Sequence, residues 1–158
     1  MKKVLFFLCI AGALASCDIF TKKKPVTGPD NKQLMINADV AFSKMSLEKG
    51  VKNAFLEFID SNGVLLKPAN FPIVGADAID YLIQMDDSAY TLQWEPRGGT
   101  VAQSGELGYT YGVYALKPAA KDTTIYGTYV SIWKKQADGS WKFVLDSGNE
   151  GVGGTEQE

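Results

Sequence analysis

Residues 105–149 read GELGYTYGVYALKPAAKDTTIYGTYVSIWKKQADGSWKFVLDSGN, and apolar or aromatic side chains recur at every second position in three parts of this stretch. Such alternation is typical of a β-strand with one buried face. The stretch therefore predicts three successive antiparallel strands, the last two joined by a tight turn at Asp138-Gly139. The side chains expected to share a face are Leu107, Tyr109, Tyr111 and Val113 in the first strand, Tyr129, Ser131 and Trp133 in the second, and Trp141, Phe143 and Leu145 in the third.

The part of the chain before this sheet has helical periodicity. Asp30 and, three residues later, Gln33 can satisfy the free amides at a helix start. Helices are expected at 31–49, 51–58 and about 76–85, and further strands at 64–67, 90–95 and 100–104, with turns at Asn62-Gly63 and 96–99. The predicted fold class is α+β, with three N-terminal helices packed on one face of a strongly curved antiparallel sheet of five to six strands. The apolar stripe expected to face the sheet in the first helix comprises Leu34, Ala38, Ala41 and Met45, widened by Met35 and Phe42.

The first 16 residues have the features of a signal peptide. Two lysines precede an apolar run from 4 to 15, which is too short to span a bilayer comfortably, since a membrane helix needs roughly 20 apolar residues. The run ends in Leu14-Ala15-Ser16-Cys17, which resembles the lipobox of bacterial lipoproteins, in which the cysteine is acylated and begins the mature chain. This resemblance implies a palmitate-bearing Cys17 that anchors the protein to a membrane of the bacterial cell envelope, facing the periplasm or the cell surface. The alternative is an ordinary signal peptide that contains a cysteine.

Four segments are expected along the chain. Residues 1–16 form the lipoprotein signal peptide, and residues 17–30, with prolines, a glycine and three consecutive lysines, form a lipidated tether. Residues 31–150 form one domain with a single core, and the glycine-rich, acidic residues 151–158 form a disordered tail. The sequence does not decide between the inner and the outer membrane.

Composition excludes several classes of chemistry. The chain has no histidine, and its two cysteines are Cys9, inside the signal peptide, and Cys17. The domain therefore lacks a thiol nucleophile, a disulfide, a Ser-His-Asp triad and the commonest zinc ligands, so no metal and no cofactor are expected. Cleavage before Cys17 removes two of the 16 basic residues and leaves 14 against 18 acidic ones, a balance that argues against nucleic acid as a partner.

The order of helices and strands, together with the motifs at 105–110, 127–133 and 138–142, resembles the nuclear transport factor 2-like superfamily over residues 32–149. Within it, the chain is most similar to the SnoaL-like branch of small bacterial proteins with a domain of unknown function. The resemblance implies a cone with a pocket at its open end and a homodimer formed through the sheet. Relatives include ketosteroid isomerase, polyketide cyclases, a dehydratase and an epoxide hydrolase, together with many members that have no activity, so the fold does not fix the function.

The candidate acid or base is Asp146, which lies near the end of the last strand among apolar neighbours that would raise the pKa of a carboxyl. Tyr109 and Tyr111 could donate hydrogen bonds to a developing oxyanion. The alternative is that Asp146 bonds the backbone of the following turn and that the tyrosines are packing residues. The residues proposed to contact a small apolar ligand are Phe42, Trp94, Tyr109, Tyr111, Tyr129, Trp133 and Asp146.

One position departs from the catalytic relatives. Ketosteroid isomerase-like enzymes have an aspartate base before a proline after the first strand, where this chain has Lys67-Pro68. Two hypotheses follow. The first is a lipid-anchored, non-enzymatic domain that binds a small molecule or a protein partner. The second is a cofactor-free isomerase, dehydratase or cyclase-type lyase that uses Asp146 with Tyr109 or Tyr111.

Overall fold

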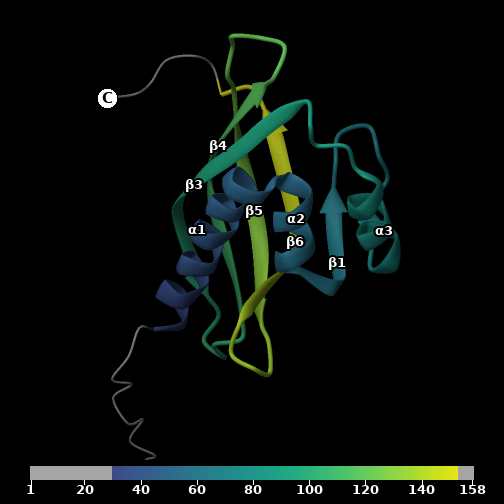
Figure 1. Cartoon of the computed structure of the whole chain (residues 1–158). Coiled ribbons are helices and arrows are strands. Elements are labelled where there is room, and N and C mark those ends of the chain that lie inside the picture. The colour runs from purple at the N-terminus through teal and green to yellow at the C-terminus, as the bar shows by residue number, and fades with distance from the viewer. Residues whose placement is uncertain (1–29, 153–158) are drawn as a thin grey trace, which may run out of the picture.

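The computed structural model describes residues 30–152, which form three helices and six strands (Figure 1). The signal peptide, the lipobox with Cys17, the tether up to residue 29 and tail residues 153–158 lie outside the described residues. Within residues 30–152, no helix combines the length and the apolarity needed to cross a bilayer. The elements are α1 (Asn31–Lys49), α2 (Val51–Phe58), β1 (Ile59–Leu66), β2 (Ile73–Val74), α3 (Ala76–Gln84), β3 (Tyr90–Val101), β4 (Leu107–Pro118), β5 (Ile125–Lys135) and β6 (Trp141–Glu150).

The six strands form one sheet in the order β2-β1-β6-β5-β4-β3, with α1 and α2 over one face (Figure 1). The sheet is mixed, because β1 and β6 run parallel, so the expectation of an antiparallel sheet is wrong at this pair. β3 to β6 follow one another through hairpins, which force antiparallel pairing, whereas β1 reaches the sheet from α2 and no hairpin fixes its direction. β1 also begins at Ile59, directly after α2, and the expected turn at Asn62-Gly63 is an irregularity within this strand.

β3 is continuous where the sequence predicts two strands and a turn. Its pairing with β4 passes from Pro96 opposite Gly112 to Gly98 opposite Tyr111, so Arg97 is an extra residue in a β-bulge. A proline lacks the N–H that a regular ladder requires and is tolerated at such a bulge. The segment expected to reverse the chain therefore bends one long strand.

α1 packs on the sheet through a face that differs from its apolar stripe. Asp30 caps the helix as predicted, accepting a hydrogen bond of 2.8 Å from the Gln33 amide. However, Ala41 is exposed, and three of the five buried side chains are polar. Ser43 Oγ accepts from the Trp94 amide at 2.9 Å and donates to the Trp94 carbonyl at 2.7 Å, so the helix supplies partners to the edge strand β3. The buried residues of α1 are Met35, Asp39, Phe42, Ser43 and Ser46.

The alternation predicted for β4 is present, and it identifies the concave face. Gly108, Thr110 and Gly112 are buried, whereas the tyrosines between them are exposed on the outer face. A Cβ at Gly108 would lie 2.6 Å from the Met35 sulfur, so this glycine allows α1 to approach the sheet closely. Phe42 of α1 lies at the centre of the core, with ring centroids of Trp94, Phe55, Phe58 and Phe143 within 5.4 Å of its own.

Candidate functional site

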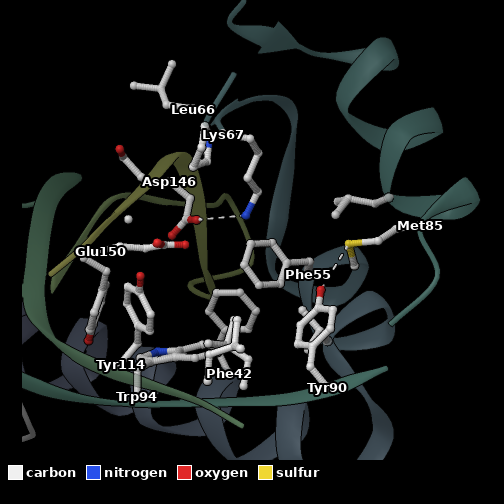
Figure 2. A pocket seen from close by; sticks show the side chains of 18 residues that line it. Phe42, Phe55, Leu66, Lys67, Met85, Tyr90, Trp94, Tyr114, Asp146 and Glu150 are labelled. Carbon is white, nitrogen blue, oxygen red and sulfur yellow. Dashed lines mark hydrogen bonds and ion pairs between the residues drawn. The ribbon is translucent and has the colours of Figure 1, made fainter. Parts of the chain in front are cut away.

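A cavity of about 200 Å³ lies at the end of the domain where β3 begins and β4 and β6 end (Figure 2). This end is opposite the start of α1, where Asn31 bonds Gly105 in the turn between β3 and β4. Most of the wall is apolar or aromatic, and the volume is below the roughly 300–1,000 Å³ typical of pockets for drug-sized molecules. The lining residues are Phe42, Val51, Phe55, Leu66, Lys67, Pro68, Leu82, Met85, Tyr90, Leu92, Trp94, Tyr114, Leu116, Tyr129, Asp146, Ser147, Gly148 and Glu150.

One side of the cavity has opposite charges. The Lys67 ammonium lies 4.0 Å from Asp146 Oδ1 and 4.7 Å from the centroid of the Phe55 ring. Figure 2 shows the Lys67 ammonium beside the Phe55 ring, with Phe42 and Trp94 on the far side of the cavity from the ion pair. Lys67 follows β1 and Asp146 belongs to β6, and the parallel pairing of the two strands, with Leu65 opposite Asp146, brings the charged groups together.

A β-bulge turns Asp146 inward. β6 pairs with β5 so that Phe143 lies opposite Trp133 and Leu145 lies opposite Ile132, which leaves Val144 as an extra residue. In a regular strand Phe143 and Asp146 would point to opposite faces. Because of the bulge both are buried, whereas Leu145, expected on the face of Phe143, is only partly buried.

Asp146 is 9% exposed and has two partners among the described residues. Ser131 Oγ donates a hydrogen bond of 2.8 Å to Asp146 Oδ2, and the Lys67 ammonium faces Oδ1. Burial raises the pKa of the Asp146 carboxyl above its usual value, although Lys67 and Ser131 both act to lower it. The cavity thus contains a carboxyl group whose proton affinity is raised and whose Oδ1 faces a cation.

A second buried carboxyl, Asp39 of α1, lies behind the aromatic wall. Asp39 is 0% exposed and accepts hydrogen bonds from Trp94 Nε1 at 2.7 Å and from the Tyr129 hydroxyl at 2.8 Å. Burial raises the pKa of Asp39, and the donors around it only partly offset this effect. Burial and the adjacent Asp39 also raise the pKa of Tyr129, so its phenol remains protonated and donates. Asp39 therefore holds two rings that line the cavity.

The structure brings together four of the seven residues that the sequence suggests for ligand contact: Phe42, Trp94, Tyr129 and Asp146 line the cavity. Tyr109 and Tyr111 do not, because they are 44% and 49% exposed on the outer face of β4, so their proposed roles are wrong. Trp133 also lies elsewhere: it is 0% exposed in the core, where its Nε1 donates to Thr110 Oγ1 at 2.8 Å.

Three of the residues that the sequence analysis did not assign to the site are Tyr114, Lys67 and Asp39. Tyr114 lines the cavity and is the tyrosine of β4 that points inward. The sequence offered a clue to Lys67, because it precedes a proline at the end of the first predicted strand. The structure places it in the cavity wall. The sequence offered no clue to the burial of Asp39, since an aspartate within a helix normally faces solvent.

The polar groups in the wall can support hydrogen bonding and proton transfer. Within residues 30–152, no group of three or more histidine, cysteine, aspartate or glutamate side chains is placed to hold a metal ion. Lys67 can donate to a ligand oxygen, and Asp146 can accept a proton or a hydrogen bond beside it. The remaining wall provides apolar and aromatic contact.

No protein-family model matches the sequence, and no curated protein matches it. Solved structures do match. A ketosteroid isomerase-like protein from Erwinia carotovora atroseptica SCRI1043 is 15% identical over 73% of this chain and 93% of that chain, with a TM-score of 0.58. An NTF2-like protein with a cystatin-like fold from Novosphingobium aromaticivorans is 13% identical over 78% of this chain and 82% of that chain, with a TM-score of 0.60.

A third similar structure, an NTF2-like protein of unknown function from Shewanella oneidensis MR-1, is 15% identical over 72% of this chain and 94% of that chain, with a TM-score of 0.55. Together these likenesses define the class: the chain has the nuclear transport factor 2-like fold, an α+β cone, as its sequence resemblance predicts. At such identities the likeness shows the fold alone, and the function must be argued from the cavity.

Proposed function

We propose that this protein is a lipid-anchored protein of the bacterial cell envelope whose domain binds a small, mostly apolar molecule without transforming it. The observation that supports binding is the cavity, whose wall combines six aromatic rings with one ion pair. Largely apolar pockets with a few convergent polar groups are the usual form of small-molecule sites. The observation that supports anchoring is the sequence Leu14-Ala15-Ser16-Cys17.

A titration with acetophenone tests binding in the unlipidated mature chain, residues 17–158 with Cys17→Ser. The ketone fits the chemistry of the cavity because it combines one aromatic ring with one acceptor. We expect saturable NMR shifts of the Trp94 indole and the Gly148 amide, both in the cavity wall. Asp146→Asn should retain binding, because a site that only binds needs no ionised carboxylate.

Two variants with the same added volume make the test specific. Leu92→Trp fills the cavity and should abolish the shifts, whereas Leu47→Trp makes the same substitution at a half-exposed residue of α1, outside the cavity wall, and should leave them unchanged. Absence of saturable shifts in the parent chain, their persistence in Leu92→Trp, or loss of binding in Asp146→Asn would each contradict the proposal.

We also propose that the domain forms a homodimer through its outer sheet face. Tyr109 and Tyr111 are exposed there with ring centroids 6.5 Å apart, and the register of β4 with β5 places Ile132 and Val130 beside them. Tyrosine is enriched in protein interfaces because it adds large contact area at low entropic cost. We name this set, together with Leu107, the outer patch.

The burial of Asp146 supports a second candidate function, catalysis of proton transfer. An ionised Asp146 could take a proton from the carbon next to a carbonyl: the C–H bond breaks, its electron pair moves toward the carbonyl oxygen, and the Lys67 ammonium faces the enolate that forms. Tyr109 and Tyr111 lie on the outer face of the sheet, away from the cavity, so they take no part in this reaction.

Deuterium exchange distinguishes the two candidates. If Asp146 acts as a base, the protein in D₂O should replace the methyl protons of acetophenone with deuterium faster than buffer does, and Asp146→Asn should abolish the acceleration. The binding function predicts no acceleration by either chain. An accelerated exchange that survives Asp146→Asn would contradict the catalytic role of this residue.

A further inference from the structure

The Lys67 and Asp146 side chains leave hydrogen-bonding capacity open toward the cavity. Their separation of 4.0 Å exceeds the roughly 2.7–2.9 Å of a charge-assisted hydrogen bond, so the two groups do not hydrogen-bond each other. No hydrogen bond joins the Lys67 ammonium to any other residue within 30–152. Ser131 occupies Oδ2 of Asp146, and Oδ1 is the oxygen that faces Lys67. A donor and an acceptor therefore stand side by side in the cavity wall.

The charges of the wall favour a neutral ligand. Lys67 and Asp146 have opposite charges, and the remaining charged lining residue, Glu150, is exposed at the end of β6. A ligand with a net charge would lose its hydration in this apolar cavity, where Lys67 and Asp146 already neutralise each other and no free counter-charge remains. Such desolvation is costly. A neutral ligand avoids this cost and can still bond both members of the pair.

The opposite side of the cavity favours a flat ring. Phe42 and Trp94 lie there, with their ring centroids 4.5 Å apart (Figure 2). The Trp94 Nε1 already donates a hydrogen bond to the Asp39 carboxylate. The indole ring is therefore fixed, and its N–H needs no partner from the ligand. An aromatic or alicyclic ring gains contact area and ring–ring interactions on such a wall.

We infer that the ligand class of this cavity is a neutral ring compound with a carbonyl and a hydroxyl on adjacent carbons, the carbonyl accepting from Lys67 and the hydroxyl donating to Asp146. This inference rests on the binding function proposed above. It assigns a recognition role to Lys67, which donates to the ligand carbonyl, and to Asp146 Oδ1, which accepts from the neighbouring hydroxyl. The apolar ring of the ligand lies against Phe42 and Trp94.

Four probes of similar size test it in the unlipidated mature chain: toluene, acetophenone, 2-hydroxyacetophenone and benzoate. We expect 2-hydroxyacetophenone to bind at least about tenfold more tightly than acetophenone, because one hydrogen bond to a charged group contributes that much. Acetophenone should bind more tightly than toluene, and benzoate should bind most weakly. Dissociation constants come from NMR titration.

Three variants identify the groups responsible. Lys67→Met should bring acetophenone to within about threefold of toluene, because the ligand carbonyl loses its donor, while the hydroxyketone keeps its advantage over acetophenone. Asp146→Asn should reduce only that advantage, because an amide oxygen accepts more weakly than a carboxylate. The matched control is Lys142→Met, since the Lys142 ammonium also lies over a ring, at 5.8 Å from the Phe58 centroid, and pairs with Glu57 away from the cavity wall. It should change nothing.

The outcomes separate this inference from the function on which it rests. If toluene and acetophenone bind saturably but 2-hydroxyacetophenone has no advantage, or if benzoate binds best, the ligand class is wrong and the binding function stands. If none of the four probes saturates, both are wrong. An unchanged advantage of acetophenone over toluene in Lys67→Met would overturn the role of this residue.

Discussion

Phe143 and Asp146 are three residues apart in β6, and both face the interior of the cone. An unbroken strand would place them on opposite faces, and the extra residue Val144 reverses the alternation between them. The same strand therefore contributes a ring to the core and a carboxyl to the cavity. The charge of the site depends on this bulge.

The pH dependence of stability should report the burial of Asp146. Its pKa is raised by burial above the usual 3.8, so the folded chain retains a proton over a range in which the unfolded chain has lost it. The stability that this group contributes is fully present below its unfolded pKa and is lost as the pH rises through its folded pKa. Asp39 acts in the same direction, and Asp60, whose pKa is lowered by a bond from the Asn62 amide, acts in the opposite one.

Because such contributions overlap, the informative quantity is the difference between parent and variant. The free energy of unfolding of the parent minus that of Asp146→Asn should fall as the pH rises from about 4 to 7. Urea midpoints measure it. A difference that rises with pH would mean that the attraction of Lys67 outweighs burial. The titratable or charged groups around Asp146 are Lys67 after β1, Asp39 in α1, Tyr114 in β4, Tyr129 in β5 and Glu150 in β6.

Asp39→Ala should be among the most destabilising single changes in the domain. It leaves the Trp94 indole and the Tyr129 hydroxyl as buried donors without their acceptor, at a cost of about 2–5 kcal/mol. Urea unfolding followed by tryptophan fluorescence measures the loss. The control, Asp122→Ala, removes a fully exposed carboxylate and should change stability by no more than about 0.5 kcal/mol. Equal effects of the two changes would contradict the role given to Asp39.

Tyr111→Glu should disrupt self-association through the outer patch. The change introduces a charge beside Tyr109 and Val130 on the outer sheet face and would leave it without a partner in the interface. Sedimentation equilibrium should show the dimer dissociation constant raised at least about tenfold. Phe71→Glu makes a similar change at a 93% exposed residue between β1 and β2 and should have no effect. A monomeric parent chain would contradict the proposed dimer.

Cys17→Ser should release the protein from its membrane. If Cys17 is acylated, the parent chain incorporates labelled palmitate in cells and sediments with membranes, and the variant does neither. Cys9→Ser should leave both properties unchanged, because that cysteine lies within the expected signal peptide. Palmitate in the Cys17→Ser chain, or a parent chain without it, would contradict the anchor.

The sequence predicts the three helices and the alternation within β4 and β5 well, because both follow from local periodicity. It does not predict which face of a strand is concave. On β4, Tyr109 and Tyr111 are more apolar than their neighbours, yet Gly108 and Gly112 face inward, where a Cβ would meet the Met35 sulfur of α1 at 2.6 Å and the Tyr129 ring at 2.8 Å. That glycine alternation was the available signal. The bulges at Arg97 and Val144 had no such signal, since they arise from pairing with neighbouring strands.

Part of the candidate site was equally predictable. Asp146 follows from a carboxyl among apolar neighbours in a strand, although its inward direction depends on the bulge. Asp39 could not be found, because its burial depends on two donors, Trp94 and Tyr129, that lie 55 and 90 residues away along the chain. Periodicity shows which residues share a helix face. It does not show that a distant strand supplies a hydrogen-bond donor to one of them.

We propose that the cavity between the Lys67–Asp146 pair and the aromatic wall is a ligand site. The decisive experiment is a crystal structure of the mature chain grown with 2-hydroxyacetophenone. We predict density for the ring against Phe42 and Trp94, with the carbonyl oxygen within hydrogen-bond distance of Lys67 Nζ. An empty cavity at saturating ligand, or density confined to the outer face of the sheet, would contradict the account.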